Sequence, residues 1–413
     1  MSKVTFAVAG MGNRGSKYAA KQLEFPDDML VTAIADPRPI RLEAANKYLN
    51  LPEDRLFDSV EKMLEAPKLA DVMIIATQDA QHKGHALAAL EKGYDLILEK
   101  PIANHLEDCE EIAARATELG RRVLVCHVLR YTPFYREVKE QLKKGTIGKI
   151  ESIEATEGVG YYHIAHSYVR GNWHKLADSS PMIVAKCCHD MDLILWLTER
   201  KCLKLNSFGC LDYFKAENCP EGATERCTDG CPHLDTCPFN APKFYLSRLP
   251  GWPTDILNPN PTEENMMEAM RTTNYGRCVF KMDNDVVDHQ TVNLQLEDGI
   301  TVTFQMVGFT AKQDRHIRIM GTKGEMWGDF RSKLIHIKLF GKPEDVIDVS
   351  DRISSFEGHG GGDSGLIKDA IHYFRNDEFD RTSITELVPS VESHRVAFAA
   401  ETSRLLGGQL VEL

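Results

Sequence analysis

The chain has 413 residues, which is enough for two or three domains with separate hydrophobic cores. Its 43% hydrophobic and 27% charged residues are typical of a globular protein, and its formal net charge of −12 argues against a nucleic-acid partner. No apolar run approaches the length of about twenty residues that spans a membrane. Because the first apolar strand follows Met1-Ser-Lys directly, we expect no signal peptide and a cytoplasmic location.

Strands and helices are predicted to alternate up to about residue 127. Short apolar runs predict buried parallel strands, and segments with helical spacing lie between them. The predicted strands are 4–9, 30–35, 72–76, 96–98 and 123–126, and the predicted helices are 16–23, 40–49, 81–92 and 106–119. This alternation predicts a doubly wound α/β sheet, whose ligand crevice lies at the carboxyl ends of the strands.

The pattern changes after Arg130. The clearest element is a β-hairpin over 292–306, in which apolar and polar residues alternate on both sides of Asp298-Gly299. The other predicted elements are helices 133–144, 190–197, 365–374 and 390–405 and strands 150–157, 317–320 and 334–339. Residues 213–285 are rich in Pro, Asn and Cys and are predicted to be a strand-poor insertion. We expect an N-terminal domain of residues 1–128 and a C-terminal α+β domain of residues 129–413 with a largely antiparallel sheet.

A dinucleotide-binding motif opens the chain. The apolar run Val4–Ala9 meets Gly10-x-Gly12-x-x-Gly15, and the next apolar run ends on Asp36. Glycine permits the tight turn, the approach of a pyrophosphate and close packing of the helix, whose N-terminus attracts phosphates. We expect NAD to bind Gly10, Gly12, Asn13, Arg14, Gly15 and Asp36. The alternative is a glycine-rich turn in another kind of α/β protein.

The acid at the end of the second strand predicts the choice of cofactor. The Asp36 carboxylate accepts free ribose hydroxyls and repels a 2′-phosphate, so NAD is expected in preference to NADP. Arg38 and Arg41 follow closely and offset part of this repulsion.

Polar residues also follow the third and fourth core strands. Thr77 and His82 follow one strand, and Glu99-Lys100-Pro101 follows the next. Both groups fall at the carboxyl edge of the predicted sheet, where a lysine can hydrogen-bond a substrate hydroxyl and the nicotinamide ribose. A surface-loop lysine is the alternative interpretation of Lys100.

These motifs make the chain resemble the Gfo/Idh/MocA family, the glucose–fructose oxidoreductase and inositol dehydrogenase group. The resemblance runs over essentially the whole length and includes Leu129-Arg130-Tyr131-x-Pro133 and His189-Asp190 before an apolar helix. It implies an N-terminal Rossmann domain, a second domain with an open sheet, a nicotinamide cofactor and a sugar-like substrate. It also implies a homodimer or homotetramer, cofactor contacts from Thr77, His82, Glu99 and Lys100, and catalysis by Lys100 with His189.

One position departs from the family pattern. Many members carry an Asp four residues before the catalytic His, whereas this chain has Ala185 followed by Lys186. Lys186 can supply a proton or bind an oxyanion, and we include it among the catalytic candidates; a lysine that points to solvent is the alternative. His189 suits proton transfer because the usual pKa of histidine is about 6.5, and a buried histidine bonded to a backbone carbonyl is its alternative.

The glycine-rich stretch Gly358–Asp363 precedes a late helix. Its glycines allow the backbone to approach a ligand closely. A similar stretch occurs in sugar-acting branches of the family, including one of NAD-dependent glycosidases. We therefore expect His359 and Asp363 to bind substrate together with Arg130 and Tyr131, or the stretch to be a flexible hinge.

Four cysteines lie close together in the predicted insertion. Cys219, Cys227, Cys231 and Cys237 fall within nineteen residues, a spacing that allows thiols to converge on a structural Zn²⁺. The irregular spacing also leaves open free or disulfide-linked thiols and an iron–sulfur cluster.

The sequence therefore predicts an NAD(H)-dependent oxidoreductase that acts on a secondary alcohol of a sugar, glycoside or cyclitol. One alternative is a redox-dependent glycosidase or lyase, in which transient oxidation acidifies a neighbouring C–H bond. The other is a non-enzymatic, nucleotide-bound sugar sensor.

Overall fold

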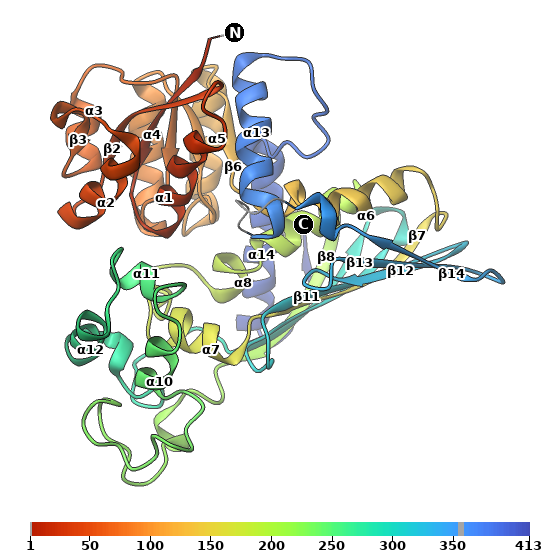
Figure 1. Ribbon diagram of the computed structural model, residues 1–413. Helices are drawn as coiled ribbons and strands as arrows, with labels where there is room; N and C mark the ends of the chain where they lie inside the picture. Colours follow the sequence, from red (N-terminus) through yellow and green to blue (C-terminus); the bar gives the residue numbers. More distant parts are fainter. Residues whose placement is uncertain (1, 354–358) are drawn as a thin grey trace.

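The computed structural model describes residues 2–353 and 359–413 and contains two β-sheets (Figure 1). The first sheet has six parallel strands in the order β3-β2-β1-β4-β5-β6. Its strands are β1 (Val4–Ala9), β2 (Met29–Ala35), β3 (Leu56–Phe57), β4 (Val72–Ile75), β5 (Asp95–Leu98) and β6 (Val123–Val125). The strand order reverses between β1 and β4, which is where a doubly wound sheet opens its ligand crevice.

Helices cover both faces of this sheet, and its central strands are accordingly mostly apolar. They are α1 (Asn13–Ala20), α2 (Pro39–Leu49), α3 (Val60–Glu65), α4 (His82–Glu91) and α5 (Leu106–Glu118). All four residues of β4 are buried, as expected for a strand between two helical layers. The late helices α13 (Gly362–Arg375) and α14 (Leu387–Leu405) add Leu366 to the core on one face and Leu387 to the core on the other.

The second sheet has nine strands in the order β14-β13-β12-β11-β7-β10-β9-β8-β15. Neighbouring strands are antiparallel except for the parallel pair β7 and β10. The strands are β7 (Ile150–Gly158), β8 (Cys202–Cys210), β9 (His289–Leu296), β10 (Thr301–Val307), β11 (Asp314–Gly321), β12 (Gly324–Asp329), β13 (Leu334–Leu339), β14 (Glu344–Asp348) and β15 (Val411–Glu412).

Helices pack against one face of the second sheet. They are α6 (Pro133–Lys143), α8 (Met182–Ala185), α9 (Cys188–Thr198) and the second half of α14. The hairpin of β9 and β10 alternates as predicted, with Val292 and Leu294 buried and Asn293 exposed between them. Asp298 and Gly299 make its turn with positive φ. The expected fold class, a parallel doubly wound sheet followed by a largely antiparallel one, is confirmed.

The segment 213–285 contains none of these strands. It carries three short helices, α10 (Ala241–Leu246), α11 (Thr254–Leu257) and α12 (Glu263–Thr272), drawn in green in Figure 1 beside α7 (Tyr161–Ile164). Its own buried apolar cluster is small and consists of Cys227, Ala241, Tyr245 and Met270.

Candidate active site

The glycine turn leaves the N-terminus of α1 open. Gly10 follows β1 with a φ of +90°, and Gly12 precedes the helix without a side-chain cap. A Cβ atom on Gly15 would lie 1.8 Å from the carbonyl oxygen of Gly10, so the helix packs this closely only with glycine there. Without a side-chain cap, the first amides of α1 remain available to a phosphate.

The carboxylate of Asp36 holds the glycine turn against the end of β2. It is buried and accepts hydrogen bonds from the backbone N–H groups of Met11 and Arg38, each at 2.9 Å. The guanidinium of Arg41 lies 3.2 Å from the same carboxylate and 3.5 Å from the Cβ position of Gly12. A negative and a positive side chain thus stand together at the ribose end of the expected dinucleotide site.

His82 joins the loops that follow β4 and β5. Its Nδ1 lies 2.8 Å from the carbonyl oxygen of Pro101, and its Nε2 lies 3.3 Å from that of Thr77. The ring is buried, at 1% exposure. These contacts connect the loop after β4 to the loop that carries Lys100.

Arg14 links the glycine turn to the late glycine-rich loop. Its guanidinium donates to Glu99 at 2.8 Å and to Asp363 at 2.6 Å, and His359 contacts both Arg14 and Asp363. Burial disfavours the charge of Glu99, yet Arg14 and Lys100 hold the pKa of this carboxyl below its usual value. The Asp363 carboxylate and the Nδ1 atom of His359 thus have partners within the protein. Gly358 of the same stretch lies outside the described residues.

Lys100 connects the end of the first sheet to the helical segment that precedes His189. Its ammonium donates to the carbonyl oxygen of Ala185 at 3.0 Å, just before α9, which carries His189. Burial and the charge of Lys100 lower the pKa of His189 well below its usual value. The imidazole is therefore neutral at neutral pH and can accept a proton. At position 185, where the sequence comparison expected an Asp, the backbone carbonyl of Ala185 accepts the hydrogen bond from Lys100.

Lys186 is buried rather than solvent-facing. It is 8% exposed, and its Nζ lies 3.2 Å from the Oε1 atom of Glu157, at the end of β7. Burial lowers the pKa of Lys186, although Glu157 opposes the effect. Arg315 on β11 completes this group of charges, with Nη2 2.9 Å from Glu157 and Nε 2.8 Å from Asp190.

Arg130 and Tyr131 have partners inside the protein. Arg130 makes a two-point ion pair with Asp192, with the shorter N···O distance at 2.5 Å, and the hydroxyl of Tyr131 lies 2.9 Å from that of Thr385. Both side chains are buried. These contacts support a positioning role for the two residues, because their polar groups are already used.

Sequence reasoning missed His127, Glu157 and Arg315. His127 follows β6, is fully buried, and its ring centroid lies 5.6 Å from that of His189. Neither ring nitrogen has a hydrogen-bond partner in the described part of the chain, although Nε2 lies 3.8 Å from Asp192. Burial and Arg130 lower its pKa. The only sequence signal was the place of His127 at the carboxyl end of a core strand.

The expected zinc site is not supported. Among the described residues, no group of three or more His, Cys, Asp or Glu side chains is arranged to hold a metal ion. Three of the four predicted ligands, Cys227, Cys231 and Cys237, do border one pocket, but they surround a space instead of converging on a point. Cys219 does not line that pocket, and Cys278, from a later part of the chain, takes the fourth place.

Within the described residues, no helix combines the length and the apolar character needed to cross a membrane. The chain was also compared with known proteins. Residues 4–127 match the GFO_IDH_MocA model, described as an oxidoreductase family with an NAD-binding Rossmann fold. The putative oxidoreductase YteT of Bacillus subtilis (strain 168) is 23% identical over 389 residues, which are 89% of this chain and 88% of that protein.

Two further comparisons concern named dehydrogenases. The D-glucoside 3-dehydrogenase of Escherichia coli (strain K12) is 29% identical over 150 residues, which are 36% of this chain and 42% of that enzyme. The solved inositol dehydrogenase homolog of Azotobacter vinelandii, complexed with NADH and myo-inositol, has a TM-score of 0.69 and 16% identity. That alignment covers 100% of this chain and 98% of the other, and at this identity it shows a shared fold.

Proposed function

We propose that this chain, whose residues 4–127 match the model of an oxidoreductase family with an NAD-binding Rossmann fold, is a Gfo/Idh/MocA oxidoreductase that oxidises a secondary alcohol of a sugar, glycoside or cyclitol, or runs the reverse reaction. The substrate class is that of the glucoside and inositol dehydrogenases it resembles. NAD is the proposed cofactor.

The residues at the glycine turn fit a dinucleotide. The space that a side chain would occupy at Gly15 is filled by the backbone of Gly10, and the amides at the start of α1 carry no capping side chain. Those amides would hold the pyrophosphate, and Asp36 would accept the ribose hydroxyls. A bound nicotinamide ring would supply the redox chemistry by accepting a hydride from the carbinol carbon.

Lys100 and His189 would manage the proton of the reacting hydroxyl. The Lys100 ammonium donates a hydrogen bond to the substrate oxygen and stabilises negative charge that develops there. His189, neutral because burial and Lys100 lower its pKa, takes the hydroxyl proton as the C–H electron pair leaves the same carbon. In the reverse direction the protonated His189 returns this proton.

One observation carries the proposal: Lys100, at the carboxyl end of β5, donates to the carbonyl of Ala185 beside the helix of His189. This contact, at the edge where the first sheet opens its crevice, supports a shared role for the two candidate groups. The test is a panel of sugars, glycosides and cyclitols incubated with NAD, with NADH measured by absorbance. Stoichiometric ketone and NADH support the proposal, and tight NAD binding without turnover on any panel member would favour the sensor.

A second candidate function is favoured by the position of Lys186. Its ammonium is buried, its pKa is lowered by burial, and Lys100 is close enough to contribute to that lowering. Such a lysine can remove a proton from the carbon beside a transient ketone, after which a glycosidic C–O bond breaks by elimination. The leaving oxygen takes up that proton, water adds to the resulting enone, and NADH returns its hydride to the ketone, so the net reaction is hydrolysis without redox change. Aglycone release without net NADH would identify this activity in the same panel.

A further inference from the structure

His163 on α7 has one ring nitrogen bonded within the protein and one that is free to accept a hydrogen bond. Its Nδ1 atom lies 3.0 Å from the Oε1 atom of Gln313. Burial and the charge of Lys186 hold the pKa of His163 well below its usual value, so the ring is neutral at neutral pH. Because an amide oxygen only accepts hydrogen bonds, Nδ1 carries the single proton of this neutral ring. Nε2 therefore keeps a lone pair that can accept.

The Nε2 atom of His163 is also open to solvent. Within the part of the chain that the structure describes, the ring makes its only hydrogen bond through Nδ1. The buried polar atoms that lack a partner include Nδ1 of His189 but not Nε2 of His163. An unpaired acceptor that reaches solvent is available to a ligand hydroxyl, as in sites where a few polar groups fix the orientation of a small molecule.

A close turn holds His163 at the end of the second sheet. Gly160, between β7 and α7, has a φ of +88°, and its N–H donates to the Thr310 hydroxyl at 3.0 Å. A Cβ atom on Gly160 would lie 3.1 Å from the backbone nitrogen of Gln313, so glycine allows the two chains to approach each other. The turn thereby sets Gln313 beside the ring of His163.

The same strand end carries the charged groups of the candidate site. Strand β7 holds Glu157, whose Oε1 atom lies 3.2 Å from Nζ of Lys186. Lys186 follows Ala185, whose carbonyl oxygen accepts from Lys100. Both lysines are close enough to His163 to contribute to the lowering of its pKa. His163 therefore lies on the second-sheet side of the site, opposite the loop that carries Lys100.

A row of aromatic rings independently connects His163 to the first sheet. The ring centroid of Tyr168 lies 6.2 Å from that of His163, and the ring centroid of Trp173 lies 6.0 Å from that of Tyr168. The indole N–H of Trp173 donates to the Asp79 carboxylate at 2.8 Å, in the loop that follows β4. The row thus reaches the carboxyl edge of the first sheet, where the cofactor is expected.

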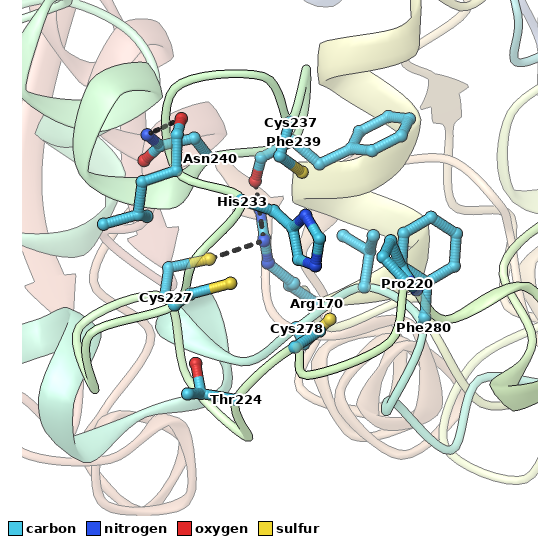
Figure 2. A pocket seen from close by; sticks show the side chains of 14 residues that line it. Arg170, Pro220, Thr224, Cys227, His233, Cys237, Phe239, Asn240, Cys278 and Phe280 are labelled. Carbon is cyan, nitrogen blue, oxygen red and sulfur yellow. Dashed lines mark hydrogen bonds between the residues drawn. The ribbon is translucent and has the colours of Figure 1, made fainter.

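The segment 213–285 holds the chain that carries His163. The ring of Trp252 packs edge to face against that of His163, with centroids 5.1 Å apart. Arg170 ends the helical stretch that follows α7, and its guanidinium donates to the carbonyl oxygen of Phe239 at 2.9 Å (Figure 2). These contacts restrict the position of the imidazole, as precise binding of a substrate group requires.

We propose that His163 is a specificity-determining residue whose Nε2 atom accepts a hydrogen bond from a second hydroxyl of the substrate, distinct from the one that reacts. This inference rests on the function proposed above, in which Lys100 and His189 hold the reacting hydroxyl. Because Nε2 presents only an acceptor, it favours a hydroxyl over an ether or carbonyl oxygen at the same position. The substrate is therefore a polyol with a free hydroxyl beyond the reacting one.

The test measures binding separately from turnover. Panel members are titrated by calorimetry into the NADH-loaded chain, as the parent and as two variants. His163→Ala removes the ring, and His163→Asn removes Nε2 but keeps a donor for Gln313 near the place of Nδ1. Both variants should weaken binding about 3- to 10-fold, the effect of losing one hydrogen bond between uncharged groups. Circular dichroism and NAD titration show that each variant has folded.

His174→Ala is the matched control. His174 is also half-buried and bonded through Nδ1, to the carbonyl oxygen of Gly171 at 2.7 Å, but its Nε2 atom lies 3.7 Å from Asp283. This variant should bind the panel members as the parent does. Parent-like binding in both His163 variants, or an equal loss in His174→Ala, would overturn the inference.

Deoxy analogues of the tightest-binding polyol identify the hydroxyl. One analogue should bind the parent about 3- to 10-fold more weakly than the polyol does, and the His163 substitutions should not weaken its binding further. An equal loss for the polyol and for every analogue would indicate a structural effect and would overturn the inference. The expected binding pattern without formation of NADH from NAD would instead refute the proposed function alone.

Discussion

Arg315 provides a quantitative test of how the buried charges of the candidate site are held. Its guanidinium lies between Glu157 and Asp190, with N···O distances of 2.9 and 2.8 Å, and all three side chains are buried. In Arg315→Met, Lys186 still neutralises Glu157, whereas Asp190 loses the cation that contacts it. Removing one partner of a buried ion pair costs about 3–5 kcal/mol. We expect the free energy of unfolding to fall by this amount.

The matched control is Arg318→Met on the same strand. Arg318 is half-exposed and pairs with Glu325 at 2.6 Å, so its removal should cost at most about 1 kcal/mol. Urea unfolding of both variants and the parent, followed by circular dichroism, gives the comparison. Equal stabilities for the two variants would refute the reasoning.

The effect of Arg315→Met on the free energy of unfolding should depend on pH. Burial already raises the pKa of Asp190, and loss of Arg315 raises it further, so the folded state then binds a proton that the unfolded state releases. The loss of unfolding free energy caused by Arg315→Met should therefore be largest at a pH well above the usual pKa of an aspartate. It should shrink as the pH falls toward that pKa. A cost that stays constant or grows on acidification would show that Asp190 is not the group left without a partner.

Three further variants and one control test the cofactor turn and the second lysine. Asp36→Ala should weaken NAD binding about 10- to 100-fold, the effect of losing hydrogen bonds to a charged group, and reduce the preference over NADP, as measured by titration with both cofactors. Gly15→Ala places a Cβ 1.8 Å from a backbone oxygen and should abolish NAD binding, whereas Gly84→Ala, with nothing within 4 Å of its Cβ, should bind NAD normally. Lys186→Met should alter the pH dependence of kcat if this lysine transfers a proton. An unchanged pH profile of kcat would limit Lys186 to neutralising the buried Glu157.

Except for the two-residue strand β3, the first sheet was predictable because its signals are local. Each strand is a short apolar run, and the glycine turn and Asp36 lie where the dinucleotide motif puts them. In the second sheet, β8, β12, β14 and β15 were not predicted. Strand β14 is polar and almost wholly exposed, and β12 contains two glycines, so pairing with neighbouring strands, not local sequence, makes them extended.

The candidate site was only partly predictable for a similar reason. Lys100 and His189 were identified from motifs, and the structure brings their segments together. Glu157 and Arg315 lie in ordinary alternating strands, so nothing in the sequence marked them as partners of Lys186. Cys278 joins the other pocket cysteines only because the chain returns after α12, and sequence spacing therefore pointed to Cys219 instead.

The most direct test of the central claim compares the parent chain with Lys100→Met on a substrate found in the panel. If Lys100 contacts the reacting hydroxyl, the variant should bind NAD with nearly the parent's affinity while kcat falls at least about 10²-fold, the effect of removing a positioned acid or base. His189→Ala should lose turnover similarly and remove the acid limb of the pH–rate profile, which lies below the usual pKa of histidine because burial and Lys100 lower it. Parent-like turnover in Lys100→Met would contradict the account.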